Sequence, residues 1–152
     1  MSRPVRIEES VTIRRPADEV WDAIANYSFD FEWRNGLTEM TPDPPGPAAM
    51  GTRVREVVRT SGREYVANAV ITQFDPGASY WFEGEGTIGG LAGGRTVRPV
   101  AEGAEFTYAI ELEPTGASRL LRPVLGSTVR SGLRKDLQKL KGVLEAQKGG
   151  TA

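Results

Sequence analysis

VRSGLRKDLQKLKGVL, residues 129–144, carries the strongest periodic pattern in the chain. Its apolar side chains recur every three or four residues, at Val129, Leu133, Leu137, Leu140 and Leu144. That spacing places them on one face of an α-helix. With Ser118 as a candidate N-cap and Pro123 near the start, the pattern predicts one helix over residues 118–147. Such a helix is about 45 Å long and can cover a β-sheet.

The N-terminal part of the chain predicts a strand followed by one or two short helices. Residues 5–13 alternate between apolar and polar side chains, which is typical of a half-buried strand. Pro16 then suits the first position of a helix, with acidic residues in the first turn, and the pattern predicts a helix over residues 16–27. A second short helical turn is expected at residues 28–33.

The middle of the chain predicts a meander of antiparallel strands. An edge strand follows Gly36, and further strands are expected at residues 52–59, 64–74, 79–83, 95–100 and 105–112. The glycine-rich run 84–94 is interpreted as a flexible hairpin loop and a candidate gate for a cavity mouth. It contains the pattern GxGxxG, but a strand follows it where dinucleotide binding needs a helix. The fold class is therefore α+β, with six to seven antiparallel strands wrapped around the C-terminal helix.

Composition excludes several classes of site. The chain has 152 residues, a net charge of −1, no cysteine and no histidine, so disulfides, Ser–His–Asp triads and the commonest metal ligand are missing. No metal or other cofactor is expected. Residues 118–148 contain eight basic and two acidic side chains, yet no aromatic residue, and nucleic acid is not an expected partner. With no signal peptide or transmembrane segment, we expect one cytoplasmic domain over residues 1–152, with a disordered tail at 149–152.

Five short phrases carry a resemblance to a known family. They are IRRPADEVW at residues 13–21, Trp33, GTRVR at 51–55, FDPG at 74–77 and LQKLKGVLE at 137–145. In this order they resemble the polyketide cyclase/dehydrase-like branch of the START-related (SRPBCC) superfamily, over roughly residues 5–146. The resemblance implies the helix-grip fold, with a cavity between the long helix and the sheet for lipids, hormones, polyketides or other apolar molecules. It also places Trp33 at that cavity.

Strand alternation supplies the candidate site residues. It places a few polar side chains on an otherwise apolar interior: Glu56, Asn68, Arg95 and Tyr108. Either Glu56 and Arg95 pair with each other or lie at the cavity mouth, or they orient a ligand oxygen. In an enzyme, Glu56 would act as a base and Arg95 would polarise an oxygen, with Tyr108 as a third catalytic candidate. The full set of expected ligand-binding residues is Trp33, Val54, Glu56, Asn68, Tyr80, Phe82, Arg95, Tyr108 and Leu133.

Three functions are consistent with these sequence patterns. The first is binding or transport of a small apolar molecule. The second is an enzyme such as a cyclase, dehydratase or isomerase that acts on a polyketide-like substrate. The third is a module that binds a partner or a membrane surface through the basic face of the C-terminal helix. The identity of the ligand and the oligomeric state are not encoded in these patterns.

Overall fold

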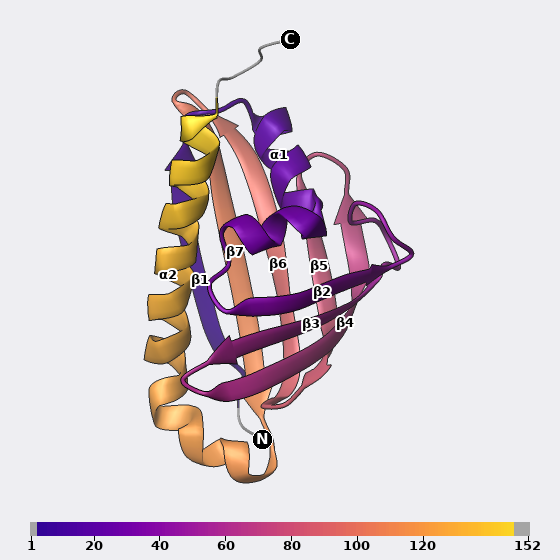
Figure 1. The fold of residues 1–152 in the computed structure, drawn as a ribbon, viewed down its shortest axis with the longest axis vertical. Helices are drawn as coiled ribbons and strands as arrows, with labels where there is room; N and C mark the ends of the chain where they lie inside the picture. Colours follow the sequence, from indigo (N-terminus) through magenta and orange to yellow (C-terminus); the bar gives the residue numbers. More distant parts are fainter. Residues whose placement is uncertain (1–2, 148–152) are drawn as a thin grey trace.

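Residues 3–147, which the computed structural model describes, form a seven-stranded antiparallel sheet and four helices (Figure 1). The strand order across the sheet is β1-β7-β6-β5-β4-β3-β2. The strands are β1 (Val5–Ile13), β2 (Leu37–Asp43), β3 (Arg53–Thr60), β4 (Arg63–Asp75), β5 (Ser79–Gly86), β6 (Gly89–Val100) and β7 (Gly103–Pro114). After β1, each strand pairs with the next in sequence, and β7 returns to pair with β1. The expected tail at 149–152 lies outside the described residues.

The helices lie in two groups. α1 (Ala17–Ala25) and the 3-10 helix η1 (Tyr27–Glu32) connect β1 to β2, while the 3-10 helix η2 (Gly116–Leu121) leads into α2 (Arg122–Ala146). α2 runs beside β1 along one side of the sheet (Figure 1). This α+β arrangement confirms the predicted helix-grip fold.

The apolar stripe of α2 forms part of the main core. Leu133, Leu137, Leu140 and Leu144 are all at most 5% exposed and belong to one buried cluster with residues of β1 and β7.

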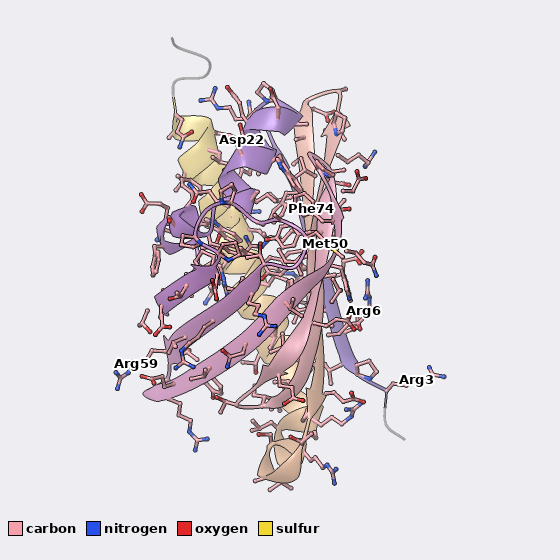
Figure 2. The ribbon with its side chains drawn as sticks, turned by 90° about the vertical axis from the view of Figure 1, so that its right-hand side faces the viewer. Arg3, Arg6, Asp22, Met50, Arg59 and Phe74 are labelled. Atoms are coloured by element: carbon pink, nitrogen blue, oxygen red, sulfur yellow. The ribbon has the colours of Figure 1, made fainter. Side chains whose placement is uncertain are left out.

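Charged side chains such as Arg6 and Arg59 extend away from the sheet (Figure 2). None of the helices described between residues 3 and 147 combines the length and the apolarity that a membrane crossing needs.

The start of the long helix differs from the prediction. Its first turn was expected at Ser118, but residues 116–121 form η2 and α2 begins at Arg122. The N-cap position is Leu121, which makes no side-chain capping hydrogen bond. Pro123 lies in the first turn of α2, where a missing backbone N–H removes no helical hydrogen bond.

The glycine-rich run is not a flexible loop, and that expectation was wrong. β5 continues to Gly86 and β6 begins at Gly89, so only two residues connect them. Several of the glycines are required by close contacts between neighbouring strands. A Cβ atom on Gly84 would lie 1.9 Å from the backbone oxygen of Asn68, and one on Gly93 would lie 2.5 Å from that of Ala109. Turn residues in a sequence can therefore also mark strands that pack too closely for side chains.

Candidate functional site

The inner face of the sheet contains a narrow cavity. Its lining residues come from β2 to β7 and from η1: Tyr27, Met40, Val54, Glu56, Ala67, Ala69, Ile71, Tyr80, Phe82, Leu91, Arg95 and Tyr108. The free volume between its walls, including the part open to solvent, is about 400 Å³. Only about 30 Å³ of this accepts the centre of a water molecule. One water needs roughly 10–15 Å³ on that measure, so about two waters fit without movement of the walls.

The cavity is not where the sequence placed it. It was expected between the sheet and the C-terminal helix, but among the described residues that line it none belongs to α2. The reason is that the leucine stripe of α2 packs against the core beside β1 and fills that space. The cavity lies instead over β3 to β6, farther from α2.

Arg95, one of the residues that line the cavity, belongs to a buried ion pair. Arg95 on β6 is 1% exposed and Asp30 in η1 is fully buried. Arg95 Nη2 donates to Asp30 Oδ2 at 2.6 Å, and Nη1 donates to Oδ1 at 3.1 Å and to the backbone oxygen of Ile24 at 2.9 Å. This bidentate geometry compensates the charge of the guanidinium, which would otherwise be very costly to bury.

Aromatic rings enclose the same guanidinium. The Cζ atom of Arg95 lies 4.8 Å from the ring centre of Tyr108, 5.1 Å from that of Trp33 and 6.0 Å from that of Tyr27. Ring faces at these distances attract a cation. The Arg95 side chain is therefore held both by the Asp30 carboxylate and by the aromatic rings, and it has little freedom to move.

A second ion pair joins the first. Arg34, just after η1, donates from Nη2 to Glu56 Oε2 at 2.8 Å and from Nη1 to Oε1 at 3.2 Å. Arg34 Nη1 also lies 3.5 Å from Asp30 Oδ2, so two arginines and two acids form one continuous network. We call these four residues the charge quartet: Asp30, Arg34, Glu56 and Arg95.

The local chain explains how η1 and the residues just after it supply two members of the quartet, Asp30 and Arg34. The Asn26 side chain caps η1 by accepting from the backbone N–H of Ser28 at 3.1 Å. The backbone N–H of Arg34 then bonds to the oxygen of Asp30 at 2.9 Å, which places the two side chains on the same side. The following residue, Asn35, donates its backbone N–H to Asp136 of α2 at 3.1 Å. The hydrogen bond from Asn35, next to Arg34 in the sequence, thus links the quartet to α2.

The arginines of the quartet keep Glu56 ionised. Burial alone would raise the pKa of Glu56, but the charge and hydrogen bonds of Arg34, with a contribution from Arg95, hold it below its ordinary value. Burial raises the pKa of Tyr27 to about 12, against the opposing charge of Arg95. Burial likewise raises the pKa of Tyr80 well above its ordinary value. At neutral pH the cavity therefore presents a carboxylate and neutral phenols.

Two buried donors beside the cavity have no acceptor within the described part of the chain. They are the Tyr80 hydroxyl and Arg95 Nε, and both residues line the cavity. Buried polar groups are normally hydrogen-bonded, so unpaired ones indicate a place for water or a ligand oxygen. The cavity lining therefore offers the ionised acceptor Glu56 and two unpaired donors, on Tyr80 and Arg95, on a mostly apolar surface.

Most of the expected site residues meet at the cavity, but three do not. Val54, Glu56, Tyr80, Phe82, Arg95 and Tyr108 line it. Trp33 and Leu133 are buried in the core and do not line it.

Asn68 was expected to face inward, and this was wrong because its side chain is exposed on the outer face. A bulge in β4 between Ile71 and Gln73 shifts the alternation, so Ile71 and Phe74 both belong to the core. If the alternation is followed back from Phe74 without the extra residue of the bulge, Asn68 is assigned to the inner face, which is the wrong one.

Sequence reasoning also missed two members of the quartet. The expected Glu56–Arg95 pair does not form, because Glu56 binds Arg34 and Arg95 binds Asp30. Asp30 and Arg34 are spaced i, i+4, which permits a salt bridge in a helix, but a six-residue 3-10 helix shows no apolar period that would reveal its buried face. Tyr27 was assigned to a helix and not to the site.

Comparison with known proteins agrees with the fold. The family model described as polyketide cyclase/dehydrase and lipid transport matches residues 4–145. The chain belongs to this family. No curated protein matches the sequence.

Solved structures share the fold of this family member at low sequence identity. The protein TTHA0849 from Thermus thermophilus is 17% identical with a TM-score of 0.76, over 95% of this chain and 99% of its own. A protein from Rhodobacter sphaeroides is 16% identical with a TM-score of 0.75, over 95% and 94%. DynU16, a protein in the dynemicin biosynthetic locus, is 18% identical with a TM-score of 0.67, over 93% of this chain and 48% of DynU16.

Proposed function

We propose that the protein binds a small, largely apolar molecule in the cavity on the inner face of its sheet. The observation that carries this proposal is a largely apolar cavity whose lining includes two quartet residues, Glu56 and Arg95, and the unpaired hydroxyl of Tyr80. Small-molecule sites typically combine apolar walls with a few convergent polar groups that orient the ligand. Membership of a family described by lipid transport and polyketide chemistry supports the same class of ligand.

The size of the cavity limits the ligand. The space that accepts the centre of a water molecule, about 30 Å³, is far below the roughly 300–1,000 Å³ of ligand pockets. Because only about two waters fit in the present conformation, binding requires the walls to move outward. Met40 on β2 and Val54 on β3 line the side of the cavity nearest the sheet edge, where fewer neighbouring strands oppose such movement. We therefore expect a small ligand, such as a single-ring or short-chain molecule, because it requires the least movement of the walls.

An enzyme of the cyclase or dehydratase type is the second candidate, and the pKa of Glu56 argues against it. A general base works best when its pKa lies near the operating pH. Arg34 lowers the pKa of Glu56 below its ordinary value, which makes this carboxylate a weak base. Binding without turnover therefore agrees better with the geometry than catalysis by Glu56 does.

The basic face of α2 gives less support to a surface-binding function. Arg130 and Arg134 both contact Glu9 of β1, at 2.8 and 2.5 Å, and Lys141 contacts Glu145 at 2.6 Å. These three cations share two carboxylates, which reduces the positive charge available to an anionic surface.

Native mass spectrometry of the freshly purified protein, followed by organic extraction, tests the proposal. We expect a fraction of the protein to carry one small molecule of low polarity, which is lost on gentle activation. Protein that runs only at its sequence mass, and that binds no member of a panel of single-ring apolar compounds, would contradict the proposal.

A further inference from the structure

We propose that Glu56 sets the charge of the ligand: the cavity accepts uncharged molecules that donate a hydroxyl group to Glu56 and rejects carboxylates. This inference rests on the proposed binding function and adds the chemical class of the ligand. It also makes Glu56 a residue that determines specificity, which differs from the role of a catalytic base.

The first support is the charge balance of the quartet. Two arginines face two carboxylates, and each arginine is matched by one acid, Arg95 by Asp30 at 2.6 Å and Arg34 by Glu56 at 2.8 Å. The sum of charges is zero, and the described residues place no further charged side chain in the lining of the cavity. An anionic ligand would therefore find no uncompensated cation there.

The second support is the openness of Glu56. Among the quartet its side chain is the most exposed, at 23%, compared with 13% for Arg34, 2% for Arg95 and 0% for Asp30. It is the acid of the quartet that lines the cavity. Of the two acids of the quartet, Glu56 is therefore the one presented to a ligand in the cavity.

The third support is the unused hydrogen-bonding capacity of that carboxylate. An ionised carboxylate offers about four acceptor positions. Arg34 occupies one on each oxygen, at 2.8 and 3.2 Å, and no other hydrogen bond to Glu56 occurs among the described residues. About two acceptor positions remain for a ligand O–H, and hydrogen bonds to ionised groups are about twice as strong as neutral ones. A ligand carboxylate in the same place would have like charge in a poorly hydrated space, which is unfavourable.

Three probes that share one 4-propylphenyl skeleton separate these effects: 4-propylphenol, 4-propylanisole and 4-propylbenzoate. At neutral pH the phenol is uncharged and donates, the anisole is uncharged and cannot donate, and the benzoate is an anion. We expect isothermal titration calorimetry on the wild-type protein to give the tightest binding for the phenol. The anisole should bind about 10- to 100-fold more weakly, the range for loss of a hydrogen bond to a charged group. The benzoate should bind most weakly of the three.

Glu56→Gln then tests which residue imposes the selection. The change removes the negative charge and leaves Arg34 uncompensated, so the benzoate should gain at least about tenfold relative to the phenol. Glu39→Gln is a matched control. Glu39 on β2 pairs with Arg55 on β3 at 3.1 Å, and both side chains are exposed to solvent. This control variant should leave the order of the probes unchanged.

A double variant covers the case in which Glu56→Gln does not fold. Glu56→Gln with Arg34→Gln restores a balanced charge, and we expect it to lose the preference for the phenol over the anisole without gaining affinity for the benzoate. Equal binding of benzoate and phenol by the wild-type protein would overturn the inference, as would an unchanged order in both Glu56 variants. Failure of all three probes to bind the folded wild-type protein would contradict the proposed function and, with it, this inference.

Discussion

Removal of the Asp30 charge should destabilise the protein more than almost any other conservative change. Asp30 is fully buried, and its two oxygens accept from Arg95 at 3.1 and 2.6 Å. In Asp30→Asn the side chain keeps its shape but loses its charge, and its amide group brings N–H donors toward the guanidinium. Arg95, which is 1% exposed, then remains buried without a full counter-charge.

The magnitude follows from the burial of both partners. Removing one partner of a buried ion pair costs about 3–5 kcal/mol, because the other charge stays desolvated. For a domain of this size, each kcal/mol shifts the Tm by about 2–4 °C, so the expected decrease is roughly 6–20 °C. Chemical denaturation followed by circular dichroism measures the free energy of unfolding directly.

Two further variants make this experiment specific. Asp22 is exposed on α1 (Figure 2), and Asp22→Asn should change the free energy of unfolding by less than about 0.5 kcal/mol. Asp30→Leu combined with Arg95→Met removes both charges and should recover most of the loss, because apolar replacements of a buried pair are often neutral. A loss below about 1 kcal/mol in Asp30→Asn would refute the assignment of the pair as a buried, mutually dependent unit.

Two other predictions concern the sheet and the buried phenols. Gly93→Ala should cost about 1–3 kcal/mol of unfolding free energy, because its Cβ would lie 2.5 Å from the Ala109 oxygen and 2.7 Å from Phe82 Cζ. Gly90→Ala, whose nearest contact is 3.6 Å, should cost much less in the same denaturation assay. Ultraviolet titration should show Tyr27 ionising near pH 12. This pKa is above the ordinary value of 10.0 that applies in the unfolded chain. The stability that neutral Tyr27 contributes is therefore present below pH 10 and is lost as the pH rises toward 12. Loss of all phenol protons near pH 10 in the folded protein would contradict that burial.

The sequence predicted the elements well where one face of each is buried. Residues 5–13 became β1, and the leucine stripe that includes Leu137 became the buried face of α2. In both cases a regular period and one-sided burial coincide, so the pattern in the sequence carries the structural information.

The sequence predicted the site only in part, because pairing and register are not periodic. Arg95 and Tyr108 were placed at the cavity by alternation alone, whereas the bulge near Gln73 reversed the face assigned to Asn68. Asp30 was missed because a short 3-10 helix has too few residues to show a buried face. Its partner Arg95 comes from a strand 65 residues away, and a single sequence does not reveal that contact.

If a small apolar molecule occupies the cavity, a larger side chain in the cavity lining should exclude it. Ala67 lines the cavity from β4, while its neighbour Asn68 is exposed on the opposite face. Calorimetric titration with 4-propylanisole, which does not depend on a hydrogen bond to Glu56, should show binding to the wild-type protein and to Asn68→Leu. In Ala67→Leu, checked for folding by circular dichroism, the affinity should fall at least about tenfold, or 1.4 kcal/mol. Equal affinities in all three proteins would mean that the molecule binds elsewhere and would contradict binding in the cavity.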